Sequence, residues 1–210
     1  MLAIAELGAH ASAPIILTQL LRLSQITGGF VPAVDNIEAS IKHQVQFTPN
    51  PKIQALRELL EDEIPENEKV VVWCRFVPEI IACAQLVSEL GYEPMLLYSG
   101  VKEEDRVPLV EYWGDPTNEK ARVLIGNPSV GGLGLNMVAA RYCVYYSNSY
   151  SLEHRLQSED RLHRIGQTGD KVTYIDLEAK DTIDGLVIDA LNAKISVADK
   201  VTSVPNHGLL

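Results

Sequence analysis

Two arginines near the end of the chain have the spacing of a pair that could act on a phosphate. Arg161 and Arg164 follow Gln157 at i+4 and i+7, so a helix would place all three side chains on one face. Paired arginines stabilise the charge on a phosphoryl group during its transfer, and a second domain often supplies them. The alternative is a solvated charged helix in which Glu159 or Asp160 pairs with an arginine.

The surrounding residues predict a helix over residues 152–164. Leu152, Leu156 and Leu162 fall on the opposite side and could dock on a core, and Gly166 would stop the helix. The sequence offers no phosphate-binding lysine motif, no magnesium carboxylate at a strand end and no aromatic clamp for adenine that we could identify. The arginine pair therefore reads as half of a nucleotide site.

A glycine-rich junction, NPSVGGLGLN at residues 127–136, precedes this helix. Gly131, Gly132 and Gly134 would let the backbone approach a ligand and present amide donors to phosphate oxygens. The segment only imitates a P-loop, because Gly132 stands in place of the lysine and Leu133 in place of the Ser/Thr. A ligand-binding loop and a tight turn fit the segment equally well.

Other predicted strand ends carry single polar groups. Arg75 could contact a phosphate, although an ordinary surface arginine is the commoner role. Ser99 and Gly100 offer a hydroxyl and an unobstructed amide, although a plain turn explains them as well. His154 and His163 are nine residues apart on the predicted helix, a spacing that does not suit a shared metal ion.

Five short apolar runs predict the strands that would position these groups. Because helical patterns separate the runs, the sequence predicts an α/β fold with a mainly parallel central sheet and helices on both faces. Ligands of such sheets bind at the carboxyl ends of the strands. The expected strands are 69–74, 94–98, 121–126, 141–146 and 171–177, and the expected helices are 14–26, 52–62, 78–90, 101–113, 152–164 and 181–194.

Length and composition set the remaining bounds. A chain of 210 residues suits one substantial domain with a flanking piece. The net charge of −10 argues against nucleic acid at first sight, but the acid concentrates in 58–68 and 103–119, whereas residues 141–171 hold clustered arginines. There is no apolar run of membrane-spanning length and no cationic signal start, and the three cysteines suit buried free thiols, so a cytoplasmic protein without a membrane partner is expected.

The order of these motifs resembles the C-terminal RecA-like lobe of Swi/Snf-type superfamily two helicases, from about residue 16 to 194. QSEDRLHRIGQ is a near-complete motif VI, NPSVGGLGLN is similar to motif V, and KVVVWCR matches the motif IV strand. The ending HRIGQ favours this family over DEAD-box RNA helicases. The resemblance implies a three-layer RecA-like lobe over 51–198, after a helical lead-in and connector over 1–50 and before a tail over 199–210.

The resemblance also implies roles for single residues. ATP and Mg²⁺ would be held mainly by the N-terminal RecA-like lobe of the parent protein, and this chain would carry no metal ligands of its own. The family usually has an acidic residue and Trp-Pro where Ser147–Ser151 reads SNSYS, which leaves contacts at that loop open. The implied arginine fingers are Arg161 and Arg164, the nucleotide-cleft residues are Gln157, Asp160, Gly132 and Gly134, and the DNA contacts are Arg75, Ser99, Gly100, Ser129, Gly131 and Asn136.

The expected function is therefore that of the C-terminal lobe of an ATP-dependent translocase on double-stranded DNA, inactive without its partner lobe. Two alternatives remain: a non-catalytic module of the same fold that binds DNA or protein, and the lobe of an RNA helicase. Because the chain lacks the long insertions of eukaryotic remodellers, a compact bacterial or viral protein is expected.

Overall fold

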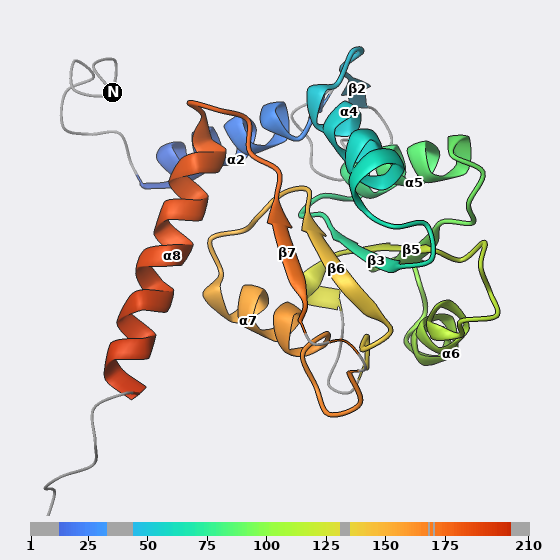
Figure 1. Ribbon diagram of the computed structural model, residues 1–210. Helices are drawn as coiled ribbons and strands as arrows, with labels where there is room; N and C mark the ends of the chain where they lie inside the picture. Colours follow the sequence, from blue (N-terminus) through green and yellow to red (C-terminus); the bar gives the residue numbers. More distant parts are fainter. Residues whose placement is uncertain (1–12, 33–43, 131–134, 168, 170, 203–210) are drawn as a thin grey trace, which may run out of the picture.

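The centre of the molecule is a five-stranded parallel sheet (Figure 1). The computed structural model describes residues 13–32, 44–130, 135–167, 169 and 171–202. The strand order is β4-β5-β3-β6-β7, and every neighbouring pair is parallel. The strands are β3 (Lys69–Trp73), β4 (Met95–Leu97), β5 (Val123–Gly126), β6 (Ala140–Tyr145) and β7 (Thr173–Asp176).

Burial along the strands follows their place in the sheet. All five residues of the central strand β3 are buried, as its run of valines predicts for a strand covered on both faces. The strand β4 lies at the edge, and Met95 and Leu96 are only half-buried. The strand expected over residues 94–98 is present but short, and it is less buried than β3 because an edge strand has a neighbour on one side only.

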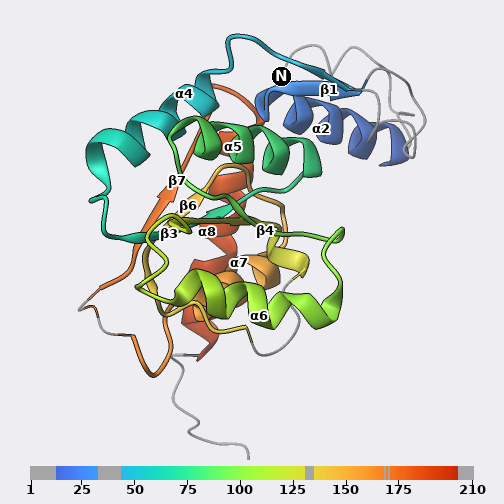
Figure 2. The same cartoon turned by 90° about the vertical axis from the view of Figure 1, so that its right-hand side faces the viewer.

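Helices cover both faces of the sheet and complete three layers (Figure 2). On one face α4 (Pro51–Glu58) and α5 (Val77–Glu89) pack on Val70, Val72 and other strand residues. The opposite face carries α6 (Glu103–Gly114) and α7 (Leu152–Asp160). The predicted α/β fold with helices on both faces is confirmed.

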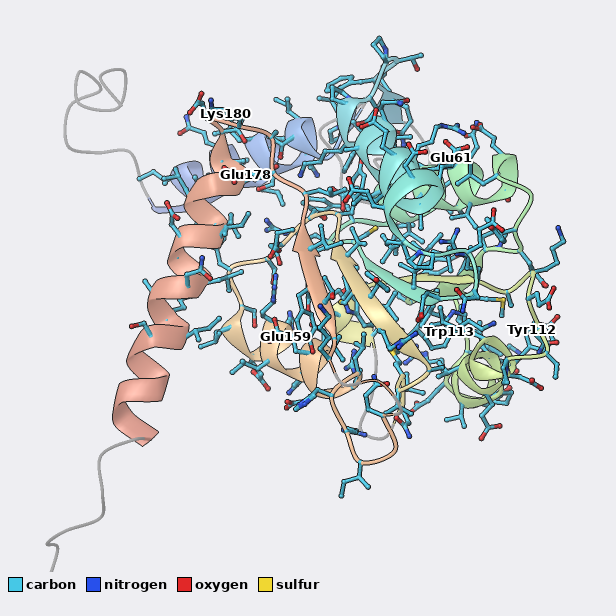
Figure 3. All side chains as sticks on the ribbon, in the orientation of Figure 1. Glu61, Tyr112, Trp113, Glu159, Glu178 and Lys180 are labelled. Atoms are coloured by element: carbon cyan, nitrogen blue, oxygen red, sulfur yellow. The ribbon has the colours of Figure 1, made fainter. Side chains whose placement is uncertain are left out.

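Helix α6 shows how its sequence directs one side to the core. Trp113 is fully buried against the sheet face, whereas the adjacent Tyr112 is 46% exposed. Figure 3 shows the two side chains pointing to opposite sides of the helix. Consecutive residues are about 100° apart around a helix, so only one of the two can face the sheet.

The N-terminal part lies beside the far end of the chain. Helix α2 (Ala13–Thr27) leads to a small antiparallel pair, β1 (Phe30–Pro32) with β2 (Gln44–Gln46), which the sequence did not predict. These three-residue strands are too short to show a period-2 pattern. Helix α8 (Ile183–Thr202) runs past the expected end at residue 194 and packs on α2 through a small apolar cluster of Ile183, Val187, Leu191 and Leu20.

The expected helix over residues 52–62 changes its winding halfway. Asn50 caps its start, because the side-chain oxygen accepts from the amides of Lys52 and Ile53. After Glu58 the chain continues as the π-helical turn η1 (Leu59–Glu63). Residues 13–32, 44–130, 135–167 and 171–202 contain no helix that is long and apolar enough to cross a membrane.

Candidate functional site at the carboxyl edge of the sheet

The arginine-bearing segment is helical only in its first part. The hydroxyl of Ser151 caps α7 by accepting from the amide of His154 at 3.2 Å, and the helix ends at Asp160. Arg161 is the C-cap residue, and the chain then turns, with Gly166 at a φ of 105°. The expected helix to residue 164 is therefore too long, and Gly166 does not stop it.

The early end of α7 separates the two arginines. Arg161 is 5% exposed, donates to the carbonyl of Pro128 at 3.1 Å and lies 5.7 Å from the Trp73 ring centroid. Burial lowers its pKa, and the nearby charge of Arg164 lowers it further. Arg164 is exposed, and its side chain makes no ion pair with any residue in the described ranges.

The other residues expected to work with this pair also lie in solvent. Gln157 is exposed and donates to Glu153 at 3.0 Å, and Asp160 is exposed. The prediction that Gln157, Arg161 and Arg164 share one helical face is wrong, because the face ends where the helix ends. Leu162 is fully buried, but Leu156 is 41% exposed, which contradicts the predicted leucine stripe.

A residue that the sequence analysis missed holds α7 on the sheet. Arg155 forms two hydrogen bonds with Asp176, at 2.6 and 3.1 Å, and one with Glu159 at 2.5 Å. Its guanidinium lies 3.6 Å from the ring centroid of Tyr145. Burial disfavours its charge, but the interactions with Asp176, Tyr145 and Glu159 together outweigh burial and raise the pKa of Arg155. Glu159 thus pairs with Arg155 and not with the arginine pair.

The junction after β5 begins with a hydrogen-bonded turn, the 3-10 turn η2 (Pro128–Val130). The side-chain oxygen of Asn127 accepts from the amide and the hydroxyl of Ser129, at 3.0 and 2.6 Å, and its amide nitrogen donates to the carbonyl of Arg75. Ser129 is exposed beside this turn. The predicted loop residues Gly131, Gly132 and Gly134 lie outside the described residues.

The remaining predicted contact residues follow different strands. Arg75 comes after β3 and is half-buried, whereas Ser99 and Gly100 come after the edge strand β4 and are exposed. Asn136 is exposed ahead of β6, and its side chain accepts from the amide of Val138 at 3.3 Å. Of this set, only Arg75 and Ser129 line the cavity at the carboxyl edge of the sheet, whose volume is about 220 Å³.

A buried carboxyl lies under this edge. Glu79, in the first turn of α5, accepts from the hydroxyl of Ser147 at 2.5 Å and from the amide of Phe76 at 3.0 Å. Burial raises the pKa of Glu79 to about 7, against the lowering effect of the Ser147 hydrogen bond. Ser147 in turn accepts from the amide of Arg75 at 2.8 Å, so the carboxyl, the serine and the arginine form one chain of contacts.

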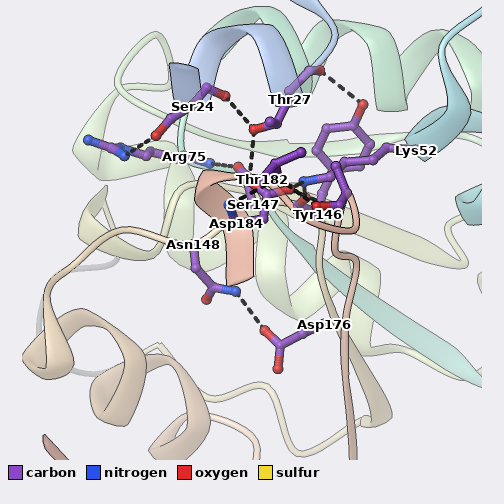
Figure 4. A network of polar contacts seen from close by, with 12 residues as sticks. Ser24, Thr27, Lys52, Arg75, Tyr146, Ser147, Asn148, Asp176, Thr182 and Asp184 are labelled. Carbon is purple, nitrogen blue, oxygen red and sulfur yellow. Dashed lines mark hydrogen bonds and ion pairs between the residues drawn. The ribbon is translucent and has the colours of Figure 1, made fainter. Parts of the chain in front are cut away.

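A second buried network ties the helices α2 and α8 to the same edge (Figure 4). Lys52 is 5% exposed, pairs with Asp184 of α8 at 2.5 Å and donates to the carbonyl of Tyr146 at 3.1 Å. The hydroxyl of Thr27, on α2, donates to Asp184 at 2.7 Å. Sequence reasoning had no signal for this network, because its members belong to segments far apart in the chain.

Comparisons with known proteins place this chain among helicase C-terminal domains. The family described as "Helicase conserved C-terminal domain" matches residues 51–166. The "ATP-dependent helicase fft3" of Schizosaccharomyces pombe is 30% identical over 148 residues, covering 70% of this chain and 16% of that protein. The "Chromatin-remodeling ATPase INO80" of Saccharomyces cerevisiae is 29% identical over 155 residues, covering 74% of this chain and 10% of that protein.

Two solved structures share the fold. The C-terminal part of the Fun30 ATPase domain superposes with a TM-score of 0.63 at 26% identity, covering 70% of this chain and 47% of that one. The SWI2/SNF2 ATPase core of Sulfolobus solfataricus, solved in complex with dsDNA, gives 0.65 at 21% identity, covering 92% and 38%. This chain spans only a small part of the length of the curated relatives.

These relatives correct the expected biological setting. The similar proteins include helicases of two yeasts, and one of them is named a chromatin-remodelling ATPase. These relatives come from eukaryotes, which contradicts the expected cytoplasmic protein of bacterial or viral origin. The expected bacterial or viral origin rested on missing insertions, and the length of surface loops is weakly constrained by the physics of a fold.

Proposed function

The chain belongs to the helicase conserved C-terminal domain family and is a C-terminal RecA-like lobe of the Swi/Snf type, and on this premise we propose that it serves an ATP-dependent translocase on double-stranded DNA. ATP and Mg²⁺ would be held mainly by an N-terminal lobe. The C-terminal lobe formed by this chain would face them across a cleft. The whole translocase would need both lobes, so this chain alone is expected to be inactive.

The observation that carries the proposal is the difference in burial and contacts between Arg161 and Arg164. Arg164 presents an uncompensated charge to solvent, which suits a group that meets a phosphate held elsewhere. Arg161 is committed to the carbonyl of Pro128, which suits a group that fixes the junction after β5. Residues 13–32, 44–130, 135–167 and 171–202 contain no cluster of three metal-ligating side chains, so the fit to ATP and Mg²⁺ is limited to the arginine side.

The proposal also includes a set of residues for the nucleotide cleft and a set of residues for DNA contact. Gln157 and Asp160 are exposed on the same segment as Arg164, where a nucleotide cleft could include them. The exposed or half-buried groups that follow the strands would contact the DNA backbone. The proposed cleft residues are Gln157, Asp160, Gly132 and Gly134, and the proposed DNA contacts are Arg75, Ser99, Gly100, Ser129, Gly131 and Asn136.

The test joins this chain to its native upstream sequence and measures ATP hydrolysis with and without duplex DNA. Arg164→Ala should lower turnover on the order of a thousandfold while leaving the melting temperature unchanged, because Arg164 is exposed. Arg161→Ala should lower both, because it also removes a buried contact. Equal rates in all three proteins would favour a non-catalytic module, and stronger stimulation by RNA would favour an RNA helicase.

The chain alone provides the control. It should hydrolyse ATP no faster than buffer, with or without DNA. Robust DNA-stimulated hydrolysis by the chain alone would contradict the half-site, since the phosphate-binding residues would then have to lie within these 210 residues.

A further inference from the structure

The turn that follows α2 packs directly over a buried carboxyl group. Gly28 is buried, and its carbonyl accepts from the hydroxyl of Tyr146, the residue after β6, at 3.1 Å. Phe30, at the start of β1, packs edge to face on Phe76, with the ring centroids 5.5 Å apart. The carboxyl under the turn belongs to Glu79, which is 1% exposed. These contacts dock the end of α2 and the strand β1 on the core.

One oxygen of Glu79 has no partner at this contact. Its Oε2 accepts from Ser147 and from the amide of Phe76, but its Oε1 is buried without a hydrogen-bond partner among the residues that the structure describes. A Cβ added to Gly28 would overlap this Oε1. Because the φ of Gly28 is not positive, the close approach of the carboxyl, and not the backbone conformation, excludes a side chain there.

The surrounding cations have other partners. The charge of Lys52, on α4, favours the ionised carboxyl, but Lys52 already pairs with Asp184 at 2.5 Å. The guanidinium of Arg75 donates to the hydroxyl of Ser24, on α2, at 3.3 Å (Figure 4). Within the described residues Glu79 forms no ion pair. A buried carboxylate without an ion-pair partner is costly, whereas the protonated group is not.

The other titratable groups of this buried cluster keep a constant charge in the acidic range. They are Cys74 after β3, Cys83 on α5, with the two sulfur atoms 3.9 Å apart, and Tyr146. Burial raises the pKa of Cys74 and of Tyr146, and thiols ordinarily titrate only near about 8.5. Helix α2 brings one charged residue, Arg22, which stays protonated, and β1 brings none. A change of charge below pH 7 is thus assigned to Glu79.

We propose that Glu79 is a pH-sensitive switch that controls the docking of α2. While Glu79 holds its proton, the neutral carboxyl allows the turn at Gly28 to pack over it. After the proton leaves, the carboxylate needs water, which reaches Oε1 only when the turn moves away and the docking of α2 loosens.

The direction of the pH effect follows from the two states of the carboxyl. Burial raises the pKa of Glu79 to about 7 in the docked state, against a usual value of 4.5 in water. Undocking is therefore favoured as pH rises from about 4.5 to 7, and the effect levels off above 7. Under the proposed function an N-terminal lobe would join the chain ahead of α2, so the connection between the lobes would depend on pH. That consequence rests on the proposed function, whereas the switch rests on the contacts of this chain.

The test is amide hydrogen exchange of the chain at pH 5 and pH 7, expressed as protection factors so that the intrinsic pH dependence is removed. Residues 17–27 should lose protection on the order of thirtyfold between the two pH values, while β3 stays better protected than α2 at both. In Glu79→Gln the protection of residues 17–27 should not change with pH. Glu89→Gln is the matched control, because it alters an exposed carboxyl on the same helix and should keep the pH dependence.

Gly28→Ala provides an independent variant. Its methyl group would displace the turn from Glu79, so residues 17–27 should already have low protection at pH 5, while β3 stays protected. The same pH dependence in Glu79→Gln and in the natural protein would overturn the switch. Equal protection of α2 and β3 under all conditions would also overturn it, since α2 would then open only when the whole domain unfolds. Unchanged protection of α2 in Gly28→Ala would contradict the contact between the turn and the carboxyl.

Discussion

At the scale of single residues, the buried charged groups are expected to affect stability most, and each has different hydrogen-bond partners. Arg122 is 2% exposed and forms no ion pair with a carboxylate of the described part of the chain; it donates to the carbonyls of Leu60 and Ile64 at 2.9 and 2.8 Å. Leu60 belongs to the π-helical turn η1 and Ile64 is its C-cap residue, and the last turn of a helix leaves carbonyl groups unsatisfied. Arg122 is therefore a structural clamp for that turn.

Replacing Arg122 by methionine should destabilise the fold by about 3 kcal/mol or more, because it strands several buried carbonyls at once. The measurement is urea unfolding of the variant beside Arg57→Met, which removes an arginine from a more exposed ion pair with Glu89. The control should change the free energy of unfolding by less than about 1 kcal/mol. Equal losses in the two variants would contradict the clamp.

Glu79 predicts a dependence of stability on pH. Its pKa is about 7 in the folded state and near 4.5 in the unfolded chain, so between these values the folded state holds a proton that the unfolded state has lost. The free energy of unfolding must therefore fall as pH rises from about 4.5 to 7, by on the order of 3 kcal/mol at most, and then level off.

The variant Glu79→Gln isolates this effect. Glutamine keeps an oxygen that can accept from Ser147 and Phe76 but cannot titrate, so the stability of the variant relative to the natural protein should rise between pH 5 and 7.5. Chemical unfolding at the two pH values measures the difference. A difference that stays constant with pH would show that Glu79 is ionised throughout.

At the scale of elements, polar contacts hold α7 where most helices rely on apolar packing. Its Leu156 is exposed, and the buried Ser158 shares a 2.7 Å hydrogen bond with Tyr145 of β6. Hydrogen bonds are directional, whereas apolar burial is not, so these contacts fix the position of the helix as well as its attachment. Because Arg161 and Arg164 directly follow α7, these contacts also position the two arginines.

Arg155→Met should destabilise the fold by about 3 kcal/mol, because Asp176 loses its ion-pair partner and keeps only the hydrogen bond from Asn148. The double variant Arg155→Met with Asp176→Asn should recover part of that loss, since it removes the stranded charge as well. Thermal unfolding of the single and double variants tests this coupling. A double variant no more stable than Arg155→Met would contradict it.

At the scale of the whole molecule, the helices α2 and α8, far apart in the sequence, meet at the carboxyl edge of the sheet. Helix α2 packs on α8, and the network of Lys52, Asp184 and Thr27 joins both helices to the end of β6. Although the net charge of the chain is −10, the cavity at this edge is lined by Arg75, His154 and Arg155 and by no aspartate or glutamate.

Deleting residues 1–32 should leave the five-stranded sheet folded but lower its stability by several kcal/mol. The deletion removes Leu20 from Ile183, Val187 and Leu191, and it removes the hydroxyl of Thr27 from Asp184. Urea unfolding and circular dichroism provide the measurement. Leu20→Ala should show a smaller loss of the same kind, and a truncated chain without a cooperative transition would contradict an independent sheet.

The sequence alone determined the class of fold, the five strands and the family, because these depend on patterns that are local in the chain. Runs of β-branched residues such as the one that forms β3 specify buried strands wherever they pair. The order of the motifs likewise placed Arg161 and Arg164 on one segment. Periodicity could not show where α7 would end.

Only the tertiary structure decided what each charge does. Arg161 became a buried contact and Arg164 an exposed one because the helix ends at Asp160 and a turn follows, in which Gln167 donates to the carbonyl of Leu162. Among the residues that the structure describes, Arg75 forms no ion pair, whereas the charge of Arg155 is balanced by Asp176. Such roles depend on burial and on partners distant in sequence, and electrostatic energies are set by these surroundings and not by residue type.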